Sequence, residues 1–99
     1  KNNESVVNLH FTVSPEHQDV VFNIGAIYFE QKKYDDALKK FDKIILSDKK
    51  FYKAYYGKGR YYETMGRKNE AIRQYKLCLD IKPDYDFAAI QLDLLERRK

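Results

Sequence analysis

The fold of this chain is decided by residues 52–85, which read YKAYYGKGRYYETMGRKNEAIRQYKLCLDIKPDY. The second half of this stretch carries five apolar residues at helical spacing: Ala71, Ile72, Tyr75, Cys78 and Leu79. Residues at i, i+1, i+4, i+7 and i+8 share one face of an α-helix. Pro83 ends the pattern, since proline cannot continue a helix. Gly66 interrupts the chain upstream, so the stretch is predicted to form two helices joined by a turn.

The same pattern occurs once more, in residues 18–51. A shift of 34 residues superposes three identical pairs: Gly25 on Gly59, Tyr28 on Tyr62, and Ala37 on Ala71. The apolar stripe is repeated at the same spacing: Ala37, Leu38, Phe41, Ile44 and Ile45. A fixed period of this length indicates an array of helical repeats.

The repeated glycines indicate a packing constraint. Gly25 and Gly59 lie in the middle of predicted helices, where glycine costs roughly 1 kcal/mol relative to alanine. Their recurrence at one phase predicts that the paired helix crosses closely there. We expect Ala37 and Ala71 to face the two glycines. We also expect three tyrosines in the core: Tyr28, Tyr62 and Tyr75.

Residues 18–51 and 52–85 resemble the tetratricopeptide repeat, a helix–turn–helix unit of about 34 residues. The resemblance rests on two sets of residues, Val21, Ile24, Gly25, Tyr28, Ala37, Phe41 and Ile44 in the first copy, and Tyr55, Gly59, Tyr62, Ala71, Tyr75, Cys78 and Pro83 in the second. It implies an all-α solenoid of antiparallel helix pairs. Three lysines depart from the family pattern: Lys32 replaces the glycine between the helices, Lys49 the proline, and Lys58 a leucine. We expect the stem of Lys58 to pack along the helix interface.

The two ends of the chain complete this organisation. Residues 86–99 continue the repeat phase and resemble the family's C-terminal capping helix, although Asp93 occupies the glycine position. Residues 1–17 support two interpretations. Alternation of apolar and polar residues over 7–13 is typical of a strand. Pro15 matches the repeat's proline position, which instead predicts the second helix of a truncated preceding repeat, and we favour this interpretation.

The composition excludes several classes of function. With Cys78 as the single cysteine and two histidines (His10 and His17), neither a disulfide framework nor a metal site is expected, and no cofactor is expected either. We expect Cys78 to be a small buried residue. No catalytic motif occurs, so we expect no enzymatic activity. The sequence contains no membrane-spanning segment, and we expect a cytoplasmic protein. Because the chain begins with Lys1 rather than methionine, we expect a fragment or a processed chain.

The resemblance also implies a ligand site. In this family the first helices of successive repeats line a concave groove that holds peptides or partner helices. The equivalent positions in this chain are Phe22, Asn23, Ala26, Phe29, Lys53, Tyr56, Arg60, Thr64, Phe87, Ile90, Gln91 and Leu94. Some members clamp a C-terminal carboxylate with lysine, asparagine and arginine. Asn23 and Lys53 match two of those places, but Gly57 occupies the arginine position.

We therefore predict a non-catalytic adaptor or scaffold module that binds a protein or peptide and not a small-molecule substrate. Residues 52–85 contain eight Lys and Arg against four Asp and Glu, while the whole chain has a net charge of +4, so the second repeat favours an acidic partner or a free C-terminal carboxylate. Two alternatives stay open. Uncovered faces at the ends would let copies of the chain self-associate, and the basic second repeat would bind nucleic acid, which is the weaker alternative.

Overall fold

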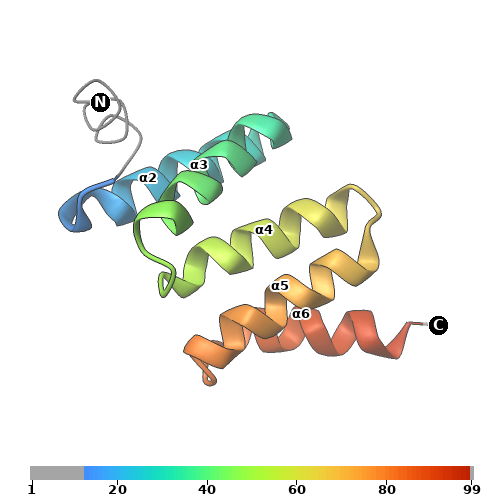
Figure 1. The fold of residues 1–99 in the computed structure, drawn as a ribbon. Helices are drawn as coiled ribbons and strands as arrows, with labels where there is room; N and C mark the ends of the chain where they lie inside the picture. The colour runs from blue at the N-terminus through green and yellow to red at the C-terminus, as the bar shows by residue number, and fades with distance from the viewer. Residues whose placement is uncertain (1–12, 99) are drawn as a thin grey trace, which may run out of the picture.

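The computed structural model describes residues 13–98, which form five α-helices joined by short turns (Figure 1). The helices are α2 (Gln18–Glu30), α3 (Tyr34–Ser47), α4 (Tyr52–Thr64), α5 (Lys68–Ile81) and α6 (Asp86–Arg97), preceded by the short 3-10 helix η1 (Pro15–His17). No strand occurs within residues 13–98. The prediction of an all-α helical-repeat fold is confirmed.

Each helix packs against its neighbours in the chain, so the structure grows as a stack. Helices α2 and α3 form one antiparallel pair and α4 and α5 form the next, with α3 against α4 and α6 against α5 (Figure 1). Helix α2 also contacts α4, the other first helix of a pair. The first helices therefore lie next to each other, as a shared groove requires.

The turns within the two pairs have the same geometry. The N–H of Lys33 donates to the carbonyl of Tyr28 and the N–H of Arg67 to that of Tyr62, both at 2.8 Å. This is the hydrogen bond that closes a helix through a left-handed residue. Gly66 takes that conformation with φ +76° and Lys32 with φ +65°. Lys32 therefore adopts the left-handed backbone conformation of this turn, although only glycine adopts it without steric strain.

Aromatic rings occupy the close crossings at the glycines. A Cβ added to Gly25 would lie 2.7 Å from Cε1 of Phe41, and one added to Gly57 would lie 2.7 Å from Cε2 of the same ring. At Gly59 the group in the way is the ring of Tyr75, whose Cδ1 would be 2.6 Å from the added atom. The predicted close crossing at Gly25 and Gly59 is confirmed.

The groups nearest to these glycines are aromatic rings and not the expected alanines. Ala37 and Ala71 are fully buried, but they lie one helical turn before Phe41 and Tyr75, whose rings fill the space beside the glycines. Glycine is needed because a flat ring lies against the backbone of the first helix.

The apolar core consists of two clusters, one for each helix pair. The first holds Ala37, Phe41, Ile44 and Ala54, and the second holds Ala71, Tyr75, Cys78, Ala88 and Leu95. Cys78 is fully buried, as predicted. Of the three tyrosines expected in the core only Tyr75 is fully buried, whereas Tyr28 and Tyr62 are half-buried at the edges of the clusters.

Lysine at the usual leucine position is accommodated as predicted. The side chain of Lys58 is only 18% exposed, and its Nζ lies 2.9 Å from Oδ1 of Asp42 on α3. The stem covers apolar surface between the helices while the ammonium group meets a carboxylate. The substitution therefore preserves the contact between α3 and α4.

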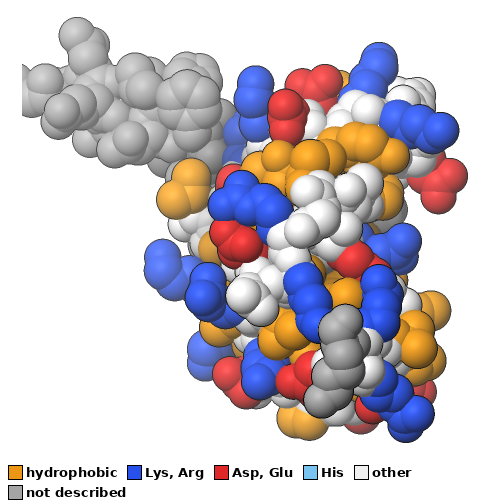
Figure 2. All heavy atoms as spheres, turned by 90° about the vertical axis from the view of Figure 1, so that its right-hand side faces the viewer, with side chains coloured by type: hydrophobic (Ala, Val, Ile, Leu, Met, Phe, Trp, Pro, Cys, Tyr) orange, Lys and Arg blue, Asp and Glu red, His pale blue; other side chains and the backbone are white. Residues whose placement is uncertain are grey.

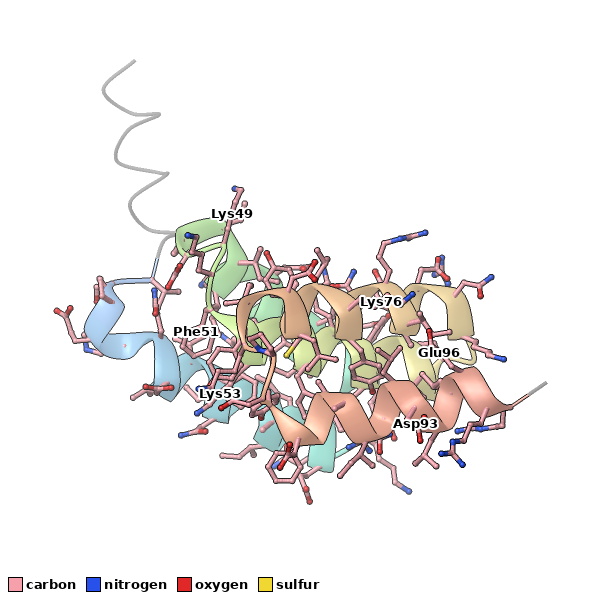
Figure 3. All side chains as sticks on the ribbon, turned by 90° about the horizontal axis from the view of Figure 1, so that it is seen from below. Lys49, Phe51, Lys53, Lys76, Asp93 and Glu96 are labelled. Atoms are coloured by element: carbon pink, nitrogen blue, oxygen red, sulfur yellow. The ribbon has the colours of Figure 1, made fainter. Side chains whose placement is uncertain are left out.

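Helix α6 covers the end of the stack. An ion pair of 3.5 Å between Lys76 on α5 and Glu96 on α6 spans the contact (Figure 3). Asp93, at the position of the repeat glycines, is exposed and pairs with Arg97 at 2.9 Å. No described helix crosses α6 at that point, so glycine is not required there.

Most of the predicted N-terminal segment lies outside the described residues. For residues 1–12 the choice between helix and strand therefore stays a prediction, and so do the exact boundaries of the four segments. The described part of that segment consists of Val13, Ser14 and η1.

Candidate functional site

A pocket lies where α2 and α4 meet, within the predicted groove. Its volume is about 160 Å³ and it is lined by Ala26, Phe29, Glu30, Phe41, Gly57 and Arg60. The ring of Phe41 reaches this place from α3 because Gly25 and Gly57 leave room on both sides. The floor of the pocket is therefore an aromatic face held in position by two glycines.

Arg60 is the cationic group of this pocket, and Glu30 is its acidic group. Its guanidinium carbon lies 5.8 Å from the ring centre of Phe29, and its Nη1 donates a hydrogen bond of 3.3 Å to the hydroxyl of Tyr56. Burial alone would lower the pKa of Arg60, but the hydrogen bond to Tyr56 and the nearby carboxylate of Glu63 raise it. The guanidinium thus remains charged and is held at the rim of the pocket.

Three further predicted groove residues lie towards the start of α2 and α4. Phe22 is half-buried and packs against the rings of Phe41 at 5.5 Å and Phe51 at 6.2 Å. Asn23 is exposed. Lys53 lies at the start of α4 beside Phe51 (Figure 3), and its Nζ is 4.0 Å from Oδ1 of Asp19.

The structure gives a physical reason why the carboxylate clamp is incomplete. Gly57 stands at the arginine position of the clamp, and any side chain there would collide with the ring of Phe41. The nearest arginine on the groove side of α4 is Arg60, almost one turn further along. A ligand carboxylate would therefore meet a different arrangement from the family's clamp.

Three of the four predicted groove residues on α6 are apolar. Phe87, Ile90 and Leu94 on α6 are 64%, 56% and 48% exposed, and their spacing puts them on one side of the helix. The ring of Phe87 lies 6.3 Å from that of Tyr56 on α4. Tyr56 therefore lies between the apolar side of α6 and Arg60 at the pocket, and it contacts both.

Glu63 is a central polar residue that no sequence motif indicates. Its Oε1 accepts hydrogen bonds from the hydroxyl of Tyr75 at 2.8 Å and from Nε2 of Gln91 at 3.1 Å, and Arg98 approaches Oε2 at 3.7 Å. Burial, followed by the hydrogen bond to Glu63, raises the pKa of Tyr75. Gln91, one of the predicted groove residues, thus connects α6 to α4. Thr64, another predicted groove residue, is exposed at the end of α4.

The groove is less basic than the sequence indicated. Asp19, Glu30 and Glu63 lie beside Lys53 and Arg60, and all three acids are contributed by the same first helices. Acidic and basic side chains also alternate on the face shown in Figure 2, with hydrophobic side chains exposed between them. A count of charges along residues 52–85 could not reveal this, because two of the acids come from α2.

A second hollow, of about 390 Å³, lies between α2 and α3. Its lining is one ring and four charged side chains: Tyr28, Asp36, Lys39, Lys40 and Lys43. Without apolar walls beyond Tyr28 it offers little surface to a peptide side chain. The pocket over Phe41 is the better candidate site.

Residues 13–98 contain no group of three or more His, Cys, Asp or Glu side chains placed to hold a metal ion. None of the helices described is both long and apolar enough to cross a membrane.

Comparison with known proteins agrees with the repeat period. Models of the tetratricopeptide repeat match residues 52–85 and 19–48. The chain is 31% identical over 68 residues to "protein SLOW GREEN 1, chloroplastic" of Arabidopsis thaliana. That match covers 69% of this chain but only 22% of the relative, so the chain spans less than a quarter of that protein.

Among solved structures, a mutant of MamA has a similar fold. The TM-score is 0.71 at 20% sequence identity, over 89% of this chain and 64% of the other. The structure agrees with these matches. Its two helix pairs repeat with a period of 34 residues, and each pair has the same turn and the same buried ring beside a glycine. The chain belongs to the tetratricopeptide repeat family.

Proposed function

We propose that this chain binds a peptide or helical segment of another protein in the groove formed by α2, α4 and α6, as an adaptor or scaffold within a larger protein. Repeats of this family generally serve in protein interactions and not in catalysis. The single observation that carries the proposal is the pocket over Phe41, because a concave, mainly apolar site with one cationic side chain is suited to hold a side chain.

Charge complementarity supports an acidic group in the partner. Lys53 and Lys58 each have a carboxylate within 4.0 Å, in Asp19 and Asp42. Among the described residues, no carboxylate lies within that distance of the Arg60 guanidinium. A ligand carboxylate would gain charge-assisted hydrogen bonds from Arg60 without displacing an existing ion pair.

The apolar surfaces support a second requirement. The pocket beside Arg60 has walls of Ala26 and Phe29, and the exposed side of α6 continues the apolar surface past Tyr56. We therefore expect a partner with a large apolar side chain next to an acidic residue, followed by further apolar residues. Burial of one such side chain contributes about 1.5–3 kcal/mol.

Nucleic acid fits this groove less well. A phosphate backbone would have to pass Asp19, Glu30 and Glu63, whose negative charges lie between the groove cations. Affinity for a polyanion depends on an uninterrupted positive surface. We expect oligonucleotide binding to disappear at moderate salt.

The test uses a random peptide library selected on the wild-type chain, followed by titration calorimetry with the tightest peptide. We expect Arg60→Glu to weaken binding about 10- to 100-fold, since a hydrogen bond to a charged group contributes roughly 1.5–3 kcal/mol. Arg73→Glu is the matched control, because Arg73 is exposed on α5, away from the groove. Equal affinities of the two variants, or a library that yields no binder, would contradict the proposal.

A further inference from the structure

The turn that leads into α2 has the geometry of the turns between repeats. Residues 14–17, 48–51 and 82–85 stand one period of 34 residues apart. In each, the N–H of the last residue donates to the carbonyl of the first, at 2.9, 3.2 and 3.1 Å. In the second and third turns, the residues that come before belong to a second helix of a repeat, α3 or α5.

Val13 lies where the end of another such helix would be. Helix α3 ends at Ser47 and α5 ends at Ile81, and Val13 is one period before Ser47. Val13 is buried, and its N–H donates a hydrogen bond of 2.6 Å to Oγ of Ser47. Val13 therefore lies beside the C-terminal end of α3.

Helix α2 has an apolar face without a described partner. Val20, Ile24 and Ile27 are 52%, 38% and 54% exposed, and positions i, i+4 and i+7 share one face. Three β-branched residues in contact with water are costly, and an exposed apolar stripe of this kind indicates a docking surface.

The equivalent positions on α4 and α6 are buried or half-buried. On α4 the residue one period after Val20 is Ala54, which is buried against α3. On α6 the residues two periods after Val20 and Ile27 are Ala88 and Leu95, which are buried against α5. In both cases the covering helix is the second helix of the preceding pair, α3 for α4 and α5 for α6.

We propose that residues 1–12 of this chain form that helix and dock on the face of α2 made by Val20, Ile24 and Ile27. By the repeat period, Val7 takes the place of Phe41 and Tyr75. Those two residues are the rings that insert between helices in the described pairs. The docked segment adds the second helix of a further repeat to the two repeats described.

The length of the segment fits the surface it covers. Helices α3 and α5 each have 14 residues, and 13 residues are available up to Val13. As a helix they would extend about 20 Å, whereas the stripe on α2 extends about 10 Å. Residues 1–12 therefore suffice to cover it.

A strand would not serve in this position. The alternating residues of 7–13 would need a neighbouring strand to pair their backbone groups, and α2 offers only side chains. A helix satisfies its own backbone and leaves Val7 and Phe11 free to contact α2.

The test is nuclear magnetic resonance on the full chain. We expect helical carbon shifts over residues 3–12 and short proton–proton contacts from Val7 and Phe11 to the methyl groups of Ile24 and Ile27. Extended shifts over residues 3–12 would overturn the proposal, as would the absence of these contacts. Contacts that appear only between labelled and unlabelled copies would assign the surface to self-association instead.

Two substitutions probe the contact from both sides. Ile27→Lys should accelerate amide exchange over residues 3–12 by about tenfold or more, because it removes apolar area from the contact. Val7→Asp should accelerate exchange in the first turns of α2 in the same way. The control is Leu46→Lys, because Leu46 is exposed on α3. If Leu46→Lys has the same effect as Ile27→Lys, the contact does not exist.

Discussion

Gly57→Ala should destabilise the protein even though it places a better helix former inside α4. The new Cβ would lie 2.7 Å from both Cε2 and Cζ of Phe41, well inside van der Waals contact. The ring cannot move away, because Gly25 touches its other side, where an added Cβ would also be 2.7 Å from Cε1. Phe41 is only 2% exposed, so no rotation towards solvent is available.

The magnitude follows from two opposing contributions. Alanine gains roughly 1 kcal/mol of helix propensity over glycine. Forcing an extra carbon into a packed core costs about 1–3 kcal/mol, and a ring held from both sides belongs at the upper end. We therefore expect a net loss of about 1–2 kcal/mol, which lowers the melting temperature of a domain of this size by roughly 5–15 °C.

Thermal and urea unfolding followed by circular dichroism measure this loss, and a second background isolates its cause. Phe41→Leu removes the ring and should itself cost about 1–3 kcal/mol. In that background Gly57→Ala should become neutral or stabilising, since only the propensity gain remains. If Gly57→Ala lowers the free energy of unfolding equally in both backgrounds, the contact with the ring is not the reason for the glycine.

Five further substitutions test the turns, the thiol and the polar contacts of α6. Lys32→Gly should stabilise by about 0.5–1 kcal/mol, because it relieves a left-handed residue, and Gly66→Ala should destabilise by about 1–2 kcal/mol for the same reason; urea midpoints decide both. Burial raises the pKa of Cys78 to about 11 from an ordinary value of 9.0, so the contribution of the neutral thiol is fully present below pH 9 and is lost as pH rises through 11. Cys78→Ala should flatten the fall of the urea midpoint over that range, and an unchanged fall would contradict the assignment. Glu63→Ala should cost about 1–3 kcal/mol by leaving the hydroxyl of buried Tyr75 without its acceptor, and a loss of the same size in Tyr75→Phe would show that the hydroxyl is the group involved.

The repeat period could be read from sequence because the same constraint appears twice. Gly25 and Gly59 each reduce helix stability relative to alanine. Because they recur at a spacing of 34 residues, their presence indicates a packing requirement and is not accidental. The period also predicts a turn at Lys32. The residue type alone would not predict one, because lysine rarely adopts a positive φ. Helical periodicity and stop signals were enough for the fold class.

The details of the groove could not be read in the same way. By sequence, Gly57 occupies the position of the arginine in the family's carboxylate clamp. In the structure it leaves space for the ring of Phe41, which lies on another helix, 16 positions away in the sequence. Glu63 carries no sequence signal, because its partners come from α5 and α6 and depend on where those helices pack. Position on a helix face follows from periodicity, but contacts between helices depend on the packed arrangement.

We propose that the groove of α2, α4 and α6 binds a peptide at the pocket over Phe41. The most direct measurement is a titration of the ¹⁵N-labelled chain with the peptide selected from the library, read as amide shift changes. We expect the largest changes at Ala26, Phe29 and Arg60, with further changes as far as Leu94. Changes confined to the outward sides of α3 and α5, or spread evenly over the chain, would contradict it.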